Sequence, residues 1–389
     1  MKFNPKDLIK GKKLYVQHRA DEKPVLAVNY LKSIGLAKKD LGQIFDNAGN
    51  WKYQITDEVD PFSLSLSDLK NLLLENLEIV YKFVSPSLDR KFKYGFNRHD
   101  IEHIEDVTGE VKKILKWKKS DKKQVAIGII AAASHDLGNL LSRSYHAHLS
   151  PYLLRLIFPN LKIKNKDWER IKLAINNHEL GVLEKTIDWQ KSSEKIIKEL
   201  KSKFLPEALA LILADKTRYG RNRISDKPKS PKAIDADIHL EVNLLGRTEK
   251  LKYSGTNFTW QLKYFAFATE DEVSQRPHLF RPKSTGPGFK ASVSKETQNR
   301  YRLEIPVDHF STWRQKFWNV YLKRNMMAIY SAFALFPKLN TFTVKMVDLV
   351  NPDSNLSETV IYKTRKENLK EFEKFLKVKY TSKKIRKNA

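Results

Sequence analysis

The chain concentrates its histidines in one stretch. Six of the ten fall between residues 99 and 178, where even placement would put about two; they are His99, His103, His135, His146, His148 and His178. Two aspartates accompany them, since Asp136 directly follows His135 and Asp215 ends the apolar run ALALILAD. Imidazoles and carboxylates gathered in this way are typical of a metal site or of an acid–base site.

The absence of cysteine restricts the chemistry. The chain has no cysteine, so disulfides and thiolate nucleophiles are excluded and any metal ligands must be His, Asp or Glu. Such a ligand set suits a divalent Mn, Fe, Co, Ni, Zn or Mg ion and does not choose among them.

Helical spacing directs the first of these side chains inward. His103 shares the row of Val107, Val111 and Ile114, which is the apolar face of its helix. The next pair follows an alanine-rich helix that Gly138 ends. Adjacent residues do not share a helix face, but at a helix end the backbone can turn, and we expect His135 and Asp136 to reach one point.

Two further residues also lie on apolar faces. His178 continues the row of Ile171 and Ile175, while Asp215 follows Leu211 and Ile212 by one turn. A buried carboxylate without a partner costs several kcal/mol. A core histidine with satisfied hydrogen bonds, or an aspartate paired with lysine or arginine, explains each position singly. Four helices that each send a His or Asp inward favour a shared cation.

These residues belong to a region of residues 91–221 that is almost entirely helical in pattern. Apolar periodicity of 3.6 predicts helices over roughly 99–116, 123–135, 149–158, 166–180, 189–201 and 205–218, separated by glycines and prolines. The preceding region 1–90 is predicted to be mainly helical. Its predicted helices are Pro24–Ile34, Lys39–Asp46 and Ser67–Phe83, the last with Ser67 as its cap.

Residues 222–237 are rich in proline and polar groups and are predicted to form a linker. The apolar period then changes to two, which predicts an α+β domain over 238–380. Its expected strands lie at 238–244, 258–264, 301–307 and 342–346, with helices at about 310–335 and 365–378. The last residues, 381–389, form a basic tail. The expected fold class is therefore multidomain, with an all-α region followed by an α+β domain.

The order His103, then His135-Asp136, then Asp215 resembles the HD-domain superfamily of metal-dependent phosphohydrolases. The apolar helix that runs into HDLG and the segment LADKTRYG carry the match, which covers about residues 91–221. The resemblance implies an all-α HD-type domain in which His103, His135, Asp136 and Asp215 hold a metal ion.

Superfamily members with a larger set of metal ligands have two more histidines between the HD pair and the last aspartate. His146 has a small residue, Ser150, four positions later, and is therefore preferred to His148; His178 fits the second place because Glu179 follows it. The resemblance implies that His146 and His178 hold a second ion bridged by Asp136, or bind phosphate directly.

One position departs from the superfamily pattern. The residue after HDLG is Asn139, where members often have lysine. If that lysine contacts phosphate, another cation must do so here, and Arg143, Lys216 or Arg218 is available.

The expected activity is metal-dependent hydrolysis of a phosphomonoester or phosphodiester in a nucleotide or nucleic acid. A metal ion lowers the pKa of its bound water towards about 7 and neutralises charge on the phosphoryl group. The expected catalytic residues are Asp136, Arg143 and Lys216, with Glu179 as general base. The alternative is a nucleic-acid or nucleotide sensor with a non-catalytic HD site.

The net charge of +27 favours polyanionic partners, although a lysine-rich composition of the whole proteome also explains it. We find no secretory signal and no membrane-spanning run, so a cytoplasmic protein with no membrane partner is expected. Besides the phosphorylated substrate, the C-terminal domain is a candidate for nucleic-acid binding. Its basic loop at 276–290 and the aromatic residues Phe258, Trp260 and Tyr264 suggest this, although such a stripe is more often core.

Overall fold

The computed structural model divides the chain into two compact units, which are treated separately below. The first consists of Met1–Phe92, Arg98–Asp188 and Glu199–Asp215, and the second of Lys93–Asn97, Trp189–Lys198 and Lys216–Ala389. The residues that the structure describes are 4–17, 21–91, 100–179, 186–188, 191–218, 246–264, 267–269, 292–297, 300–304, 323–348 and 358–363. The first unit thus includes both the N-terminal region and most of the region predicted to be HD-type.

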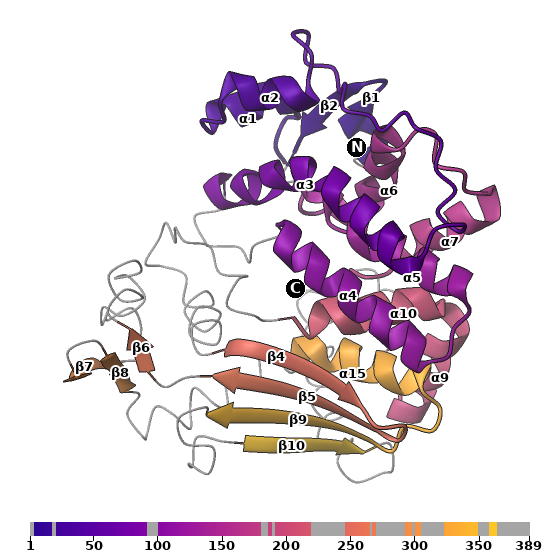
Figure 1. The fold of residues 1–389 in the computed structure, drawn as a ribbon, viewed down its shortest axis with the longest axis vertical. Helices are drawn as coiled ribbons and strands as arrows, with labels where there is room; N and C mark the ends of the chain where they lie inside the picture. Colours follow the sequence, from indigo (N-terminus) through magenta and orange to yellow (C-terminus); the bar gives the residue numbers. More distant parts are fainter. Residues whose placement is uncertain are drawn as a thin grey trace, which may run out of the picture. The chain divides into compact units, whose positions relative to one another are not determined.

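The N-terminal region combines a small antiparallel sheet with two short helices (Figure 1). Its elements are the 3-10 helix η1 Pro5–Leu8, strands β1 Ile9–Lys10, β2 Lys13–Val16 and β3 Val25–Leu26, and helices α1 Ala27–Ser33 and α2 Lys38–Ile44. The predicted pair of short helices is confirmed. The sheet was not predicted, because its strands are too short to establish an alternating pattern.

Helix α3, Leu66–Lys91, is the long helix expected before residue 90, but its predicted cap was wrong. Ser65 caps it, accepting a hydrogen bond from the Asp68 main-chain N–H at 3.1 Å. Its hydroxyl also donates to the Asp68 carboxylate at 2.7 Å, while Ser67 lies inside the helix. A serine fits the cap position best when an acidic residue follows three positions later.

The remaining helices of this region follow the predicted order. They are α4 Ile101–Trp117, α5 Lys122–Ser134, α6 His146–Ile157, α7 Asn165–Asn176, α9 Ser193–Lys203 and α10 Pro206–Lys216, with the 3-10 helix η2 Leu137–Leu140 between α5 and α6. Several boundaries differ from the prediction by a few residues. Helix α6 begins at His146, three residues earlier than predicted, so Pro151 lies inside it. Helix α7 ends at Asn176, so His178 follows the helix instead of lying within it.

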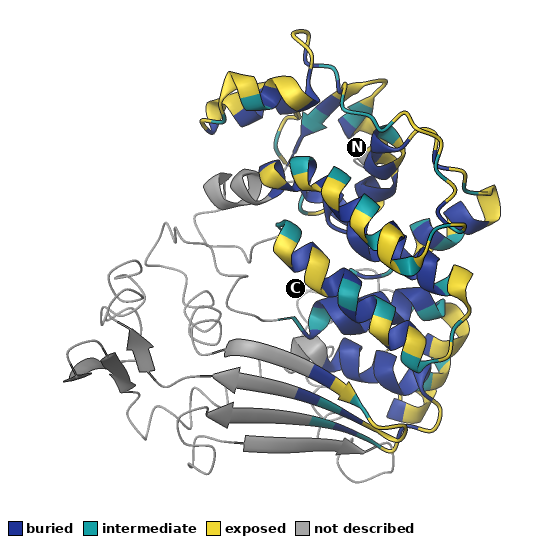
Figure 2. Cartoon of the chain, in the orientation of Figure 1, coloured by how far each residue is buried: buried dark blue, intermediate teal, exposed yellow. Residues whose placement is uncertain are grey.

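Close packing of α5 against α4 agrees with the small residues of the α5 sequence. A Cβ on Gly128 would lie 2.4 Å from Leu115 Cδ1 and 3.1 Å from Val111 Cγ1, so even one methyl group would crowd the two helices. From Val125 to Ser134 every residue of α5 is buried, as Figure 2 shows for the interior of this unit.

In the second unit the structure describes a mixed four-stranded sheet in the order β10-β9-β5-β4 and an antiparallel three-stranded sheet in the order β6-β8-β7. The strands are β4 Gly246–Tyr253, β5 Asn257–Tyr264, β6 Phe267–Thr269, β7 Ser292–Thr297, β8 Arg300–Glu304, β9 Thr341–Asp348 and β10 Glu358–Lys363. Strands β5, β8 and β9 were predicted. The others were missed, because charged residues such as those of GRTEKLKY interrupt the apolar alternation. Strands β5 and β9 are parallel, and the outer pairs are antiparallel.

Three aromatic residues of the large sheet form core. Phe258, Trp260 and Phe342 are fully buried, and Phe336, directly after helix α15 Lys323–Leu335, packs on Phe258 at a centroid distance of 4.9 Å. A role for Phe258 and Trp260 as a stacking surface for bases is therefore wrong, because their rings are used inside this unit. Helix α15 lies within the segment predicted to be helical, at about 310–335.

Several predictions lie outside the described residues. They are the linker 222–237, the strand at 238–244, the basic loop 276–290, the helix at 365–378, the tail 381–389 and the position of His99. None of the helices in the described part of the chain has the length and apolar character needed to cross a membrane.

Candidate metal centre

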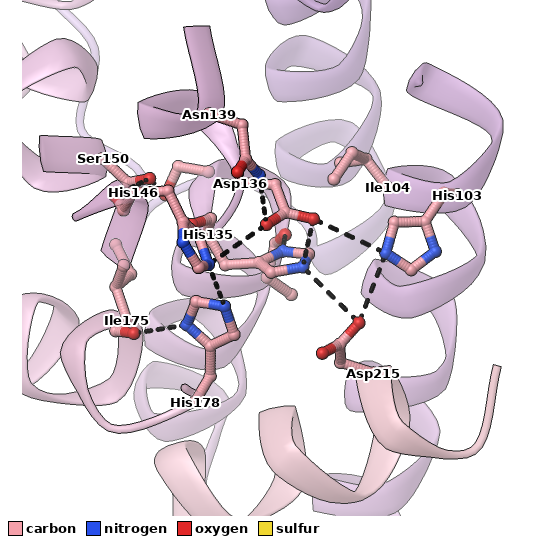
Figure 3. A network of polar contacts seen from close by, with 12 residues as sticks. His103, Ile104, His135, Asp136, Asn139, His146, Ser150, Ile175, His178 and Asp215 are labelled. Atoms are coloured by element: carbon pink, nitrogen blue, oxygen red, sulfur yellow. Dashed lines mark hydrogen bonds and ion pairs between the residues drawn. The ribbon is translucent and has the colours of Figure 1, made fainter. Parts of the chain in front are cut away.

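Six side chains that the sequence singled out converge in the interior of the first unit (Figure 3). They come from α4, the end of α5, the start of α6, the turn after α7 and α10, and they are His103, His135, Asp136, His146, His178 and Asp215. Each is buried, with at most 7% of its surface exposed. Three overlapping groups of three offer ligand atoms within 4.8 Å of one another.

The first turn of α4 fixes His103. The Asp100 carboxylate caps the helix by accepting a hydrogen bond from the His103 main-chain N–H at 3.2 Å. The apolar residues Ile104, Val107 and Val111 are fully buried on the same helix and hold this face in the core. His103 therefore points inward, as its row predicts.

The end of α5 presents two adjacent residues to one point. His135 is the C-cap residue, and Asp136 has left the helix with φ −103° and ψ 1°. The change of backbone direction brings Asp136 Oδ2 to 3.1 Å from His135 Nε2. A regular helix would have pointed the two side chains apart.

One half of the cluster combines two imidazoles with two carboxylates. His103 Nε2 lies 3.3 Å from Asp215 Oδ1 and 3.7 Å from Asp136 Oδ2. His135 Nε2 lies 3.9 Å from the same Asp215 oxygen. These atoms therefore face a common small volume between α4, α5 and α10.

The other half uses the second oxygen of Asp136. His146 Nε2 lies 3.6 Å from Asp136 Oδ1 and 3.2 Å from His178 Nε2. Asp136 is thus shared between the halves, with one carboxylate oxygen facing each. The ring of His178 also lies close to that of His135, at a centroid distance of 4.9 Å.

Main-chain carbonyls orient three of the four imidazoles in the same way. The Nδ1 atom of each ring lies near the carbonyl oxygen three residues earlier: His135 at 2.7 Å from Ala132, His146 at 2.8 Å from Arg143 and His178 at 2.5 Å from Ile175. An Nδ1–H that donates to a carbonyl leaves Nε2 as the lone-pair nitrogen, and metal-binding histidines are commonly held in this way. All three Nε2 atoms face the cluster.

The donor set fits a divalent cation. Although Asp136 is nearby, His135 Nε2 is buried and makes no hydrogen bond within the described residues. A buried polar atom without such a bond normally costs free energy. Four imidazoles and two carboxylates in one buried cluster supply the nitrogen and oxygen ligands that such ions prefer.

The electrostatics of the two halves differ. Burial opposes protonation of His135, yet the negative charges of the nearby Asp136 and Asp215 outweigh it and raise the pKa of His135. Burial, together with Arg143 and His178, instead lowers the pKa of His146 well below its ordinary value. The half with two carboxylates is therefore the more attractive to positive charge.

Asn139 and Arg143 form a chain of contacts that ends at Asp136. The Asn139 side-chain amide donates to Asp136 Oδ1 at 2.8 Å, and its carbonyl oxygen accepts a hydrogen bond from Arg143 Nη1 at 3.1 Å. Asn139 is fully buried and Arg143 is half-buried. The residue that departs from the superfamily pattern thus orients the carboxylate shared by both halves.

Ser150 joins α6 to the end of α5. Its hydroxyl lies 2.7 Å from the His135 carbonyl oxygen and 2.9 Å from that of His146, and it accepts a hydrogen bond from the Gly138 main-chain N–H at 2.8 Å. In the sequence analysis Ser150 mattered only as a small residue four positions after His146. Its hydroxyl in fact connects the backbones that carry two of the histidines.

Tyr81 of α3 was not predicted to belong to this site. Its hydroxyl donates to the Ala133 carbonyl oxygen at 2.9 Å. Burial and the negative charge of Asp136 raise its pKa far above the usual range of a tyrosine. No motif identifies it, because Tyr81 lies 55 positions before Asp136 and shares only the ordinary apolar period of its helix.

The remaining predicted residues lie in more exposed positions. Glu179 directly follows His178 and is half-buried, and Lys216 and Arg218, at and just after the end of α10, are also half-buried. His148 is exposed, whereas His146 is buried, so of these two histidines only His146 lies in the cluster.

Comparison of the chain with protein-family models, with curated proteins and with solved structures gave no match. The resemblance to the HD-domain superfamily therefore rests on the residue pattern.

Proposed function

We propose that the chain is an HD-type metal-dependent phosphohydrolase that acts on a phosphomonoester or phosphodiester of a nucleotide or nucleic acid. The observation that carries the proposal is the convergence of six buried histidine and aspartate side chains from five elements. Their order along the chain is the one that suggested the superfamily. Carbonyl acceptors hold three of the imidazoles with Nε2 towards the cluster.

Asp136 would be the ligand common to two ions. His103, His135 and Asp215 would complete the set for the first, and His146 and His178 for the second. A bound divalent ion supplies hydroxide near neutral pH and offsets negative charge on a phosphoryl group. A Cys nucleophile is excluded, because the chain has no cysteine.

The chain's own residues would orient the substrate and move a proton. Arg143, which donates a hydrogen bond to Asn139, would meet a phosphate oxygen. It lies four residues after Asn139, the position where superfamily members often have lysine. Lys216 is a second cation assigned to phosphate. Glu179, next to His178, is the assigned general base, since a carboxylate that is partly open to solvent can accept a proton and release it to water.

The alternative function is a nucleic-acid or nucleotide sensor whose metal site is not catalytic. The observation that favours it is Asn139, because a neutral amide bound to Asp136 replaces the expected cation. Metal binding without hydrolysis of any substrate would support the sensor and contradict the enzyme.

The test begins with metal analysis of the purified chain, followed by phosphatase and phosphodiesterase assays with Mn²⁺ on nucleotides, cyclic dinucleotides and RNA ends. We expect bound metal and turnover of at least one substrate class. Absence of metal under all loading conditions would contradict both the enzyme and the metal-dependent sensor.

Two variants sharpen this test. Asp136→Ala removes the carboxylate shared by both halves, so we expect loss of bound metal and loss of turnover together. His148→Ala is the matched control, since this histidine is exposed only two residues from His146, and both properties should stay near wild type. Full metal content and turnover in Asp136→Ala would place the site elsewhere.

A further inference from the structure

A lysine-rich turn joins α4 to α5 at the far end of α4 from His103. Within residues 112–123, here called the lysine turn, seven lysines accompany a single acidic residue, Asp121. The lysines are Lys112, Lys113, Lys116, Lys118, Lys119, Lys122 and Lys123. The Asp121 carboxylate is already engaged, since it caps α5 by accepting a hydrogen bond from the Gln124 N–H at 2.7 Å.

Only part of this positive charge is matched by nearby carboxylates. Lys113 pairs with Glu110 at 3.3 Å and Lys123 with Asp167 at 2.7 Å. Four other lysines of the turn form no ion pair within the described residues; they are Lys112, Lys116, Lys118 and Lys119. Lys116 and Lys119 are exposed, and the other two are half-buried.

The lysines of this surface also repel one another. Burial lowers the pKa of Lys112, and the charges of Lys116 and of Lys70 on α3 lower it further. Lys70 itself pairs with Glu105 at 2.9 Å, which leaves the Lys112 and Lys116 charges to be compensated from outside. An anion bound there would be attracted by both Lys112 and Lys116.

The backbone at the tip of the turn is strained. Lys119 has a φ of 60°, a left-handed conformation that usually falls to glycine after a helix. A lysine adopts this conformation less readily than a glycine, because its Cβ then lies close to the backbone. Such strain is often found at functional positions, and here it presents an exposed cation where a glycine would be more stable.

We propose that the lysine turn is a surface that binds the phosphate backbone of nucleic acid. Lysines without partners attract phosphates, and release of counterions drives such binding. A lipid surface fits less well, because a membrane-binding segment presents apolar side chains beside its lysines. The large apolar residues exposed in the described part of the chain are Val25, Tyr152 and Leu173, and none lies in the turn.

The position of the turn indicates a polymer. Lys116 lies 13 residues after His103 on the same helix, which corresponds to about 20 Å along its axis. A free nucleotide held at the candidate metal centre does not extend that far. The binding inference is independent of the proposed activity, and combined with that activity it names a polynucleotide as the substrate class.

Fluorescence anisotropy with the full chain tests this inference. The probes are a labelled 30-nucleotide single-stranded DNA, the same sequence as RNA, and a 30-base-pair duplex, all with EDTA so that metal and hydrolysis play no part. The test variant combines K112Q, K116Q, K118Q and K119Q. The control combines K32Q, K38Q, K39Q and K52Q, which removes four exposed lysines of the N-terminal region and changes the net charge equally.

We expect the wild-type chain to bind at least one probe, the test variant to bind it at least tenfold more weakly, and the control to change little. The slope of log Kd against log salt concentration should fall by up to about 2.8 to 3.6 in the test variant, since each of the four lost phosphate contacts contributes roughly 0.7 to 0.9. Circular dichroism melting checks that all variants are folded.

Three results would overturn the inference: no nucleic-acid binding by the wild type, an equal loss in both quadruple variants, or lysine-dependent binding to phosphatidylserine vesicles alone. Asp136→Ala separates this inference from the proposed function, because it should bind the probes as the wild type does even if it has lost metal.

Discussion

Asp136 is the residue on which the candidate centre depends most. One of its carboxylate oxygens faces His103 and His135, and the other faces His146 and accepts the Asn139 amide. A carboxylate that serves two sides at once must be held in one rotamer. The hydrogen bond from the Asn139 amide holds the Asp136 carboxylate in this orientation. Asn139 is therefore a positioning residue for Asp136.

The variant Asn139→Ala tests whether Asn139 positions Asp136 for metal binding. Removal of the amide frees one oxygen of Asp136 and also releases Arg143, and loss of such an outer partner typically costs 10–100-fold in metal affinity. We therefore expect Kd for Mn²⁺ or Zn²⁺, measured by isothermal titration calorimetry, to rise about 10–100-fold. His148→Ala provides the baseline. An unchanged affinity in Asn139→Ala would show that Asp136 is held by other contacts.

At the scale of elements, the turn η2 must lie directly against the start of α6. Gly138 makes this possible, because a Cβ at this position would lie 2.1 Å from the His146 carbonyl oxygen. The obstacle is backbone, which cannot rotate away as a side chain can. The distance between the Asp136 and His146 segments is therefore set by a residue without a side chain.

Gly138→Ala should destabilise the first unit by about 2–3 kcal/mol, in the range for overpacked interiors. Gly109→Ala is a matched control inside α4, where an added Cβ meets nothing within 4 Å. There alanine should stabilise by about 0.5–1 kcal/mol, because it favours the helix. Urea unfolding of both variants measures the difference. Equal effects at the two positions would contradict the close contact.

A buried ion pair joins α7 to α10, the helices that lead to His178 and carry Asp215. Arg170 donates to the carboxylate of Glu207, which is fully buried. Burial raises the pKa of Glu207 above its usual value, and the Arg170 charge offsets only part of this. Between the ordinary and the raised pKa, the folded state therefore holds more protons at Glu207 than the unfolded state.

This difference in bound protons makes the free energy of unfolding depend on pH. The contribution of Glu207 to the free energy of unfolding should fall as pH rises through that window and recover as pH is lowered towards 4.5. Glu207→Gln does not titrate, so the stability of the wild type relative to this variant should decrease with rising pH. Urea unfolding from pH 4.5 to 7.5 measures it. A difference that grows with pH would mean that Arg170 dominates over burial.

At the scale of the whole molecule, the candidate ligands lie in one of two compact units. A metal that binds only the folded centre stabilises that unit by mass action, by about 2.7 kcal/mol at a free concentration 100 times Kd. Calorimetry should therefore show that Mn²⁺ or Zn²⁺ raises the melting temperature of one transition, and that EDTA reverses the shift. The transition of the second unit should respond little.

The same scan on Asp136→Ala is the control for nonspecific metal effects. Its melting temperatures should not respond to metal. A similar shift in the variant, or an equal shift of both transitions in the wild type, would contradict binding at this centre.

The sequence by itself determined the local features. Apolar rows predicted that His103 and Asp215 point into the core, and both are buried. The small residues of α5 agree with its close packing, although only the structure shows that the neighbour is α4. The choice of His146 over His148 came from the superfamily pattern. The structure agrees with it, since His146 is buried and His148 is exposed. The apolar periodicity of a helix depends only on the residues of that helix, so it can be recognised from the sequence alone.

Only the tertiary structure decided the contacts between elements. It assigned the Asn139 amide and the Ser150 hydroxyl to the centre, brought in Tyr81 from α3, and placed His178 beyond the end of α7. It also paired β5 with β9 and β9 with β10 in a mixed sheet. The physical reason is that a hydrogen bond between distant segments depends on how their elements pack, and no spacing along the chain encodes that distance.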